Sequence, residues 1–218
     1  WLGRNILGYA VMAMLLVLQP ELRKALEELG KKKLVSVFPF DSSKREAGEV
    51  TVNTVNEITN ACIEMSKVKT GALIVIEREQ SLTDYESTGI DIDAIVSSQL
   101  LINIFEHNTP LHDGAVIIRG NRVTAATCYL PLTDKSNISK DLGTRHRAGV
   151  GISEAADSIT VIVSEETGRI SLAVDGNLYR NVEGEKLKEH LMEHLKLNVV
   201  IKNTKNKKNK TKQRKGKA

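Results

Sequence analysis

The sequence has few aromatic residues and few cysteines. Phe, Trp and Tyr make up 4% of its 218 residues, so a core has to be built from Ile, Val, Leu and Ala, as in α/β and α+β sheet proteins. Few rings are available to stack on nucleic-acid bases. Cys62 and Cys128 lie in apolar stretches with no Cys or His at metal-ligand spacing, which predicts reduced core residues of a cytosolic domain.

Several common catalytic motifs are absent as well. The sequence contains no Gly-x-x-x-x-Gly-Lys-Ser/Thr segment. Gly149-Val150-Gly151 lacks the third glycine and the preceding strand of a dinucleotide-binding fingerprint. The nucleophile elbow Gly-x-Ser-x-Gly and the metal-binding pair His-Glu-x-x-His are also missing. These absences argue against a P-loop kinase and a Rossmann dehydrogenase.

Positive charge is concentrated at the C-terminal end. The formal net charge is +4, but nine of the 31 Lys and Arg lie between Lys202 and Ala218, where no acidic residue occurs. The preceding 201 residues carry 22 basic and 27 acidic residues, so the body of the chain is mildly acidic. We expect residues 201–218 to be a disordered basic tail; attraction to anionic lipid or nucleic acid is the alternative.

An apolar run, Ile6–Leu18, precedes a helical pattern that ends at Gly30. Thirteen residues are too few to cross a bilayer, which takes about 20, and no small-residue cleavage site of a signal peptide follows. One interpretation is a buried or interfacial helix. We favour the cytoplasmic end of a transmembrane helix, because the basic residues expected on the cytoplasmic side follow it. Residues 1–30 are then the end of that helix and a coiled connecting helix, and residues 31–50 a linker.

Hydrophobic periodicity predicts one folded domain over residues 51–200. Apolar residues spaced by three or four predict helices over 52–69, 94–105, 144–156 and from 184 onward. Runs of β-branched residues predict strands over 72–77, 115–119, 122–130, 158–164 and 169–174. Because strands alternate with helices and also pair as hairpins, we expect an α/β (α+β) fold with a mixed, mostly antiparallel central sheet flanked by helices.

The segment His112-Asp113-Gly114-Ala115 sets an imidazole and a carboxylate directly before an apolar strand. Glycine adopts backbone angles that are closed to other residues, so a ligand is able to approach the main chain closely there. An ordinary turn before a strand explains the same residues. The segment therefore becomes informative only beside other polar clusters.

A second polar cluster, Arg145-His146-Arg147, follows Gly143 and Thr144 at the predicted start of a helix. Thr144 is placed to cap that helix. Free backbone N–H groups, the positive end of the helix dipole and two guanidinium groups together suit a polyphosphate. Surface arginines, with His146 in a structural hydrogen bond, are the alternative.

The segment Ser164-Glu165-Glu166 ends a predicted strand. Its acids either solvate a turn or, with Asp113 and His112, hold a divalent cation that bridges phosphate oxygens. Tyr129 and Leu130 end another strand. They are either core residues or a cover for a planar base.

Together these segments resemble the bacterial diadenylate cyclase (DAC) domain family. The resemblance rests on Leu111–Ile118 and Gly143–Ala148, followed by Ile152–Glu154 and Val163–Gly168, in the same order and at similar spacing. It covers roughly residues 19–197 and implies the DAC fold. The apolar run leading into Gln19–Arg23 is similar to the membrane-anchored class, in which transmembrane helices precede a coiled connection. Gly149 departs from the family, whose members usually carry alanine there.

The resemblance implies an enzyme that condenses two ATP molecules into cyclic di-AMP, a second messenger, with release of two pyrophosphates. The reaction takes place where two copies face one another, so the resemblance implies a homodimer, a divalent cation (Mg²⁺ or Mn²⁺) and a membrane location with the catalytic domain in the cytoplasm. It implies no specific nucleic-acid partner.

The resemblance also assigns roles to individual residues. Asp113 orients and deprotonates the 3′-hydroxyl, and Gly114 and Ala115 let the nucleotide approach the backbone. Binding of the triphosphate and stabilisation of its charge are assigned to Thr144, Arg145, His146 and Arg147. Phosphate and metal binding is assigned to Ser164, Glu165, Glu166 and His112, with Asp113 also a metal ligand. The adenine contacts are assigned to Tyr129 and Leu130.

Two other functions stay open on the sequence. A non-catalytic sensor of ATP or a cyclic dinucleotide would keep the phosphate site without needing the carboxylate of Asp113. A binder of anionic surfaces or nucleic acid would depend on the basic tail. Deletion of residues 202–218 would abolish the function of such a binder, whereas the activity of an enzyme would survive.

Overall fold

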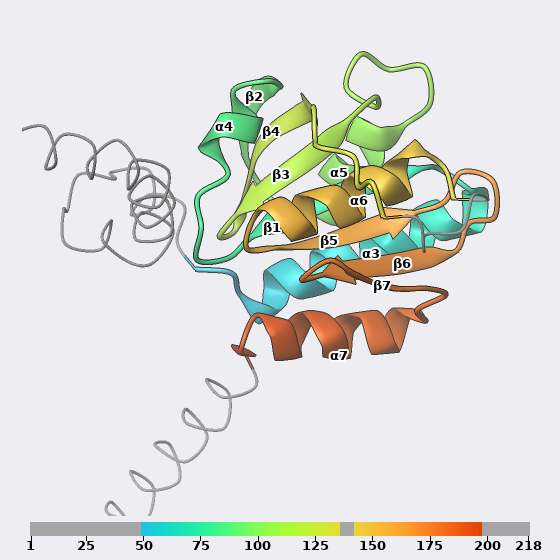
Figure 1. Cartoon of the computed structure of the whole chain (residues 1–218). Helices are drawn as coiled ribbons and strands as arrows, with labels where there is room; N and C mark the ends of the chain where they lie inside the picture. The colour runs from blue at the N-terminus through green and yellow to red at the C-terminus, as the bar shows by residue number, and fades with distance from the viewer. Residues whose placement is uncertain (1–48, 136–141, 198–218) are drawn as a thin grey trace, which may run out of the picture. The chain divides into compact units, whose positions relative to one another are not determined.

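The computed structural model describes residues 49–135 and 142–197 (Figure 1). The expectations for residues 1–30, for the linker up to residue 48 and for the tail over 201–218 lie outside these residues. Within the part that is described, no helix has both the length and the apolar character needed to cross a membrane.

A seven-stranded mixed sheet forms the centre of the domain, in the order β2-β4-β3-β1-β5-β6-β7. Its strands are β1 (Ala72–Glu77), β2 (Ile90–Ile95), β3 (Ala115–Arg119), β4 (Arg122–Cys128), β5 (Ser158–Val163), β6 (Ile170–Val174) and β7 (Asn177–Tyr179). β1 and β3 pair in parallel, and the other neighbouring strands pair antiparallel. This confirms the expected mixed, mostly antiparallel sheet.

Helices cover both faces of the sheet (Figure 1). They are α3 (Val52–Val68), α4 (Thr83–Glu86), α5 (Ser98–Phe105), α6 (Thr144–Ala155) and α7 (Gly184–His194). Side chains of α3, α5 and α7 share one hydrophobic core with Ile74 and Ile76 of β1. Those of α6 share a second core with Leu73 and Val75. Since β1 is buried on both faces, its apolar run is continuous rather than alternating.

The helix α3 follows the sequence pattern closely. Thr51 and Thr54 form a capping box at its start. The predicted apolar stripe is buried as far as Met65, and Cys62 lies within it as a free, fully buried thiol. Burial raises the pKa of that thiol to about 12, so it stays protonated at neutral pH. Val68 is 73% exposed and does not belong to the buried stripe.

The helix predicted over 94–105 is wrong in its first turn. Residues 90–95 form the edge strand β2, and Ile95, which lies in the predicted helix, is 65% exposed. The helix α5 begins only at Ser98, because the Ser97 side chain accepts a hydrogen bond from the Leu100 N–H group and caps it. The short elements α4 and β7 were not predicted either.

The α6 helix packs closely on β5 and on the chain after β4 because two of its residues are glycines. An added Cβ at Gly149 would lie 2.9 Å from Ile162 Cδ1, so an alanine at this position would require that side chain to move. At Gly151 an added Cβ would lie 2.1 Å from the Pro131 carbonyl oxygen. The end of a side chain is able to move away from an added methyl group, but the backbone is not. A larger residue is therefore tolerated less well at Gly151 than at Gly149.

We expect Gly151→Ala to lower the free energy of unfolding by about 2–3 kcal/mol, because overpacking against backbone outweighs the gain in helix propensity. Thermal denaturation followed by circular dichroism measures this. Gly149→Ala, in the same helix, is the control, because its added Cβ meets the movable end of the Ile162 side chain rather than backbone. Equal melting temperatures for the two variants would contradict the expected packing.

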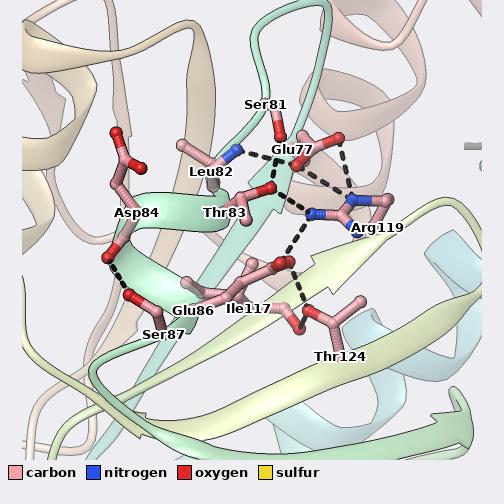
Figure 2. Close-up of polar contacts among 10 residues, drawn as sticks. All are labelled: Glu77, Ser81, Leu82, Thr83, Asp84, Glu86, Ser87, Ile117, Arg119 and Thr124. Carbon is pink, nitrogen blue, oxygen red and sulfur yellow. Dashed lines mark hydrogen bonds and ion pairs between the residues drawn. The ribbon is translucent and has the colours of Figure 1, made fainter. Parts of the chain in front are cut away.

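A buried ionic cluster connects α4 to the sheet (Figure 2). Arg119 donates from Nε to both carboxylate oxygens of Glu77, at 3.1 Å each, and from Nη2 to Glu86 Oε2 at 2.6 Å. The Thr124 hydroxyl donates to the other oxygen of Glu86, and the Leu82 N–H group donates to Glu77. The cluster lies at the Glu77 end of β1, away from the Ala72 end.

Candidate active site

The predicted site residues meet at the Ala72 end of β1. Strand register places them there: Ala72 pairs with Val163, and Ala115 pairs with Cys128. Since β3 runs parallel to β1, the start of β3 lies at the same end as the end of β5. Neighbouring strands are about 4.8 Å apart, and β1 lies between β3 and β5. The start of β3 and the end of β5 are therefore separated by roughly 10 Å.

Gly114 provides the backbone geometry that the sequence suggested. Its φ of +107° lies in a region that favours glycine. An added Cβ would lie 2.8 Å from the carbonyl carbon of Thr127, which itself has a φ of +61°. The register of β3 and β4 shifts just after Ala115, so a bulge sets the direction of this segment. The neighbouring Asp113 is exposed and has no hydrogen bond or ion pair within the described residues.

His112 is held in one orientation by a backbone carbonyl. Its Nδ1 lies 2.6 Å from the Thr109 oxygen, so Nδ1 carries the proton and Nε2 is left as the open ring nitrogen. This is the arrangement typical of a metal-ligating histidine. However, no group of three or more His, Cys, Asp or Glu side chains in residues 49–135 and 142–197 is placed to hold a metal ion.

A pocket lies between the start of α6, the β5–β6 turn and the segment after β7. It brings Thr144, Arg145 and His146 together with the Ser164-Glu165-Glu166 segment. The other polar residues that line it are Thr167, Arg169, Ser171, Arg180 and Asn181. Arg147 is exposed and lies outside this lining. His112–Ala115 and Tyr129 also lie outside it, at the β3–β4 side of the same sheet end.

The start of α6 differs from the prediction. Gly143, not Thr144, is the N-cap, and no side chain caps the helix. Thr144 is the first helical residue, and it lines the pocket. The backbone N–H groups of Thr144 and Arg145 have no acceptor among the described residues. Free donors at the positive end of a twelve-residue helix are suited to an anion.

Arg145 is held across the sheet end by a carboxylate. Its Nη1 pairs with Glu165 Oε2, and the guanidinium group lies over Gly71. An added Cβ at Gly71 would lie 2.7 Å from Nη1 of Arg145. Glu165 therefore positions an arginine in this structure, and Gly71 provides the space for it.

His146 is buried and lies 3.4 Å from the Ser171 hydroxyl. Burial, together with the nearby charge of Arg180, lowers the pKa of His146. The imidazole is therefore neutral at pH 7. It contributes hydrogen bonding at the wall of the pocket rather than the positive charge that the motif suggested.

Tyr129 is not a core residue, since its side chain is 74% exposed. Its N–H group donates to Thr88 Oγ1 at 2.9 Å, which fixes the chain at the end of β4. Leu130 is half-buried against the second core. An exposed ring beside a fixed backbone is available to cover a planar group.

Sequence reasoning missed Arg169 and Arg180. Arg169 follows the predicted β5–β6 turn, where its carbonyl accepts from the Ser164 N–H group at 3.0 Å. Because the sequence predicts a hairpin there, it could have placed Arg169 beside Ser164. Arg180 follows the unpredicted strand β7, so nothing in the local sequence pointed to it.

The fold and the site define a nucleotide-binding domain of the DAC type. Residues 59–178 match the family described as DAC, DisA bacterial checkpoint controller nucleotide-binding. The chain belongs to this family.

Individual relatives agree with the family assignment. The chain is 49% identical over 199 residues to the cyclic di-AMP synthase CdaA of Bacillus subtilis (strain 168), a match covering 91% of this chain and 71% of the relative. It is 47% identical over 195 residues to a diadenylate cyclase of Listeria monocytogenes serotype 1/2a (strain 10403S), covering 89% and 70%.

Solved structures match as well. A crystal structure of a double cysteine mutant of DacA from Staphylococcus aureus is 52% identical, with a TM-score of 0.64, covering 66% of this chain and 95% of the other. A structure described as a hypothetical membrane spanning protein from Bacillus cereus is 35% identical, with a TM-score of 0.56, covering 77% and 79%.

Proposed function

We propose that this protein is a diadenylate cyclase, which condenses two ATP molecules into cyclic di-AMP and two pyrophosphates. One observation carries the proposal: three polar segments far apart in the sequence, at Asp113, Arg145 and Ser164, meet at one end of the sheet beside a cationic pocket. Relatives that are 47–49% identical over most of the chain are named for this activity.

The two halves of the sheet end suit the two parts of ATP. Triphosphate binding belongs to the pocket, where the free N–H groups of α6, Thr144 and Arg145 converge with Ser164 and Glu166. Arg147, on the exposed side of the same turn, adds positive charge for the phosphates. The adenosine belongs to the other half, with Tyr129 and Leu130 at the base.

Asp113 is the residue proposed for the chemistry. It orients and deprotonates the 3′-hydroxyl, whose oxygen then attacks the α-phosphorus of the second nucleotide in line. It is exposed and lies outside the pocket lining, on a strand end separated by roughly 10 Å from the β5 side of the sheet. This separation favours attack on a nucleotide held by a second copy of the chain, so we propose a homodimer that works face to face.

A divalent cation fits this site only as part of a substrate complex. The DAC family generally depends on such a cation, but the described residues form no cluster of three protein ligands. His112, Asp113 and Glu166 are the predicted ligands, but Glu166 lines the pocket and the other two lie on the β3 side, so one cation would be held by His112 and Asp113 or by Glu166, not by all three of one chain. Phosphate oxygens would complete its coordination, and hard oxygen ligands suit Mg²⁺ or Mn²⁺. When bound, the cation neutralises charge on the phosphates.

We also propose attachment to the cell membrane through the N-terminal region, with the catalytic domain on the cytoplasmic side. The apolar run over residues 6–18 and the basic residues after it support this proposal. The similarity to a structure described as membrane spanning also supports it.

The test is to incubate the protein with ATP and either Mn²⁺ or Mg²⁺ and to identify the nucleotide product by mass. We expect cyclic di-AMP. Binding of ATP without any product would instead support the sensor function, which the activities named for the relatives do not favour. Activity that survives deletion of residues 202–218 would show that the basic tail is accessory.

We expect Gly71→Ala to weaken ATP binding roughly 5- to 10-fold, because the added methyl group displaces the Arg145 guanidinium from its position beside Glu165. Isothermal titration calorimetry measures the affinity. The control repeats the substitution in an Arg145→Ala background, where it is expected to have no further effect. An equal loss in both backgrounds would mean that Gly71 does not act through Arg145.

A further inference from the structure

We propose that Arg180, assisted by Arg169, binds the two terminal phosphates of ATP and stabilises the leaving pyrophosphate. This inference rests on the proposed cyclase function and adds residues that lie outside the recognised motifs. Both arginines line the pocket together with Thr144–His146 at the start of α6. The pocket therefore contains two arginines from outside the recognised motifs in addition to Arg145.

Within the described residues, no carboxylate pairs with these two arginines. Arg145 is already paired with Glu165. By contrast, neither Arg169 nor Arg180 forms an ion pair or a side-chain hydrogen bond within residues 49–135 and 142–197. Two guanidinium groups without carboxylate partners, beside the free N–H groups of a helix start, form an anion site that is open on the pocket side.

The backbone at Arg180 is fixed from both sides. Before it, the Tyr179 ring stacks on His190 of α7, with ring centroids 5.9 Å apart. After it, the Val182 N–H group donates to the Ile170 carbonyl oxygen at 2.9 Å. Between them, Asn181 turns the chain with a φ of +56°. Arg180 therefore extends from a held turn, so binding a ligand does not require the backbone there to be ordered first.

Arg180 also acts electrostatically on His146, the buried histidine that lines the pocket. Its charge lies near enough to His146 to help keep that imidazole neutral. A phosphate between Arg180 and the start of α6 would meet a guanidinium fork on one side and backbone donors on the other. The planar fork of arginine matches two phosphate oxygens at once, which a lysine cannot do.

These contacts serve the proposed reaction at its leaving group. The 3′-oxygen, having lost its proton to Asp113, forms a bond to the α-phosphorus. The bond from that phosphorus to the oxygen bridging to the β-phosphorus breaks, and pyrophosphate leaves with the electron pair. Negative charge grows on the pyrophosphate, so a cation held there stabilises the transition state more than the bound substrate.

The experiment compares ATP with AMP, which lacks the two terminal phosphates. We expect Arg180→Ala to weaken ATP binding roughly 10- to 100-fold and to change AMP binding less than about twofold, since only ATP reaches the arginine. Arg180→Lys should recover part of the ATP affinity, because it keeps the charge but loses the fork. Calorimetry at fixed Mg²⁺ gives both affinities, and a melting curve of each variant reports folding.

Lys186→Ala is the matched control. It removes one positive charge from the same region, but Lys186 lies on α7 and lines none of the pocket. Its ATP and AMP affinities should equal those of the unmodified protein. Equal weakening of ATP and AMP by Arg180→Ala, or no weakening of either, would overturn the inference.

The outcome is separable from that of the proposed function. If the unmodified protein yields no cyclic di-AMP but Arg180→Ala still lowers the affinity for ATP and not for AMP, the cyclase proposal fails and the phosphate contact stands. If cyclic di-AMP forms and Arg180→Ala forms it at an unchanged rate and with unchanged ATP affinity, the contact fails and the cyclase stands.

Discussion

Replacing Asp113 by Asn is expected to lower cyclic di-AMP formation by roughly 10²- to 10⁴-fold, the contribution typical of a general base. The amide has the size of the carboxylate but accepts no proton. Asp113 is exposed and is not part of the phosphate pocket, so ATP affinity should change less than about threefold. This is the result expected when a substitution removes an interaction that is made only in the transition state. A product assay beside calorimetry measures both quantities.

The control for this substitution is Asp84→Asn, at an exposed aspartate of α4 whose carboxylate has no partner within the described residues. It should leave product formation unchanged. Normal turnover by Asp113→Asn would remove Asp113 from the mechanism.

Mixed dimers give a sharper test of the same residue. If two copies act face to face, equal amounts of unmodified and Asp113→Asn chains should give about a quarter of the full cyclic product, because only pairs of unmodified chains form both phosphodiester bonds. Pairs of one chain of each kind form one bond and release a linear dinucleotide, which mass spectrometry detects. A yield of about half, without the linear species, would mean that each chain acts alone.

The central strands were predictable from the sequence, but the edge of the sheet was not. Strands β1, β3 and β5 are buried on both faces, so their β-branched runs are unbroken. The edge strand β2 alternates Ile with Asp, and because it follows Gly89 directly before a helical stripe, the sequence pattern favoured a helix start there. The exposed side chains Ile90 and Ile95 provide no burial signal for the strand.

The site was predictable as far as it consists of contiguous segments. Asp113-Gly114-Ala115 and the turn that starts α6 are local motifs, and the register of the sheet brings them to one end. Contacts between distant segments were not predictable in the same way. The pairing of Arg145 with Glu165, the burial of His146 and the position of Arg180 all depend on which strand neighbours which.

The ionic cluster around Arg119 is the largest buried charge arrangement away from the active site in the described residues. Glu77 and Glu86 are 4% and 9% exposed, and Arg119 is the cation that they share. Burial alone lowers the pKa of Arg119, but the charges and hydrogen bonds of the two glutamates outweigh it and raise the pKa. Removal of the arginine would leave two carboxylates buried together without a cation.

We therefore expect Arg119→Met to lower the free energy of unfolding by about 3–5 kcal/mol, as when one partner of a buried ion pair is removed. Urea denaturation measures this. The control is Arg122→Ala, whose partner Asp93 is 78% exposed, so it should cost less than about 1 kcal/mol. Glu77→Gln added to Arg119→Met should recover part of the loss, because one of the two unpaired charges is gone. If both arginine variants cost the same, the cluster contributes no more than a surface ion pair.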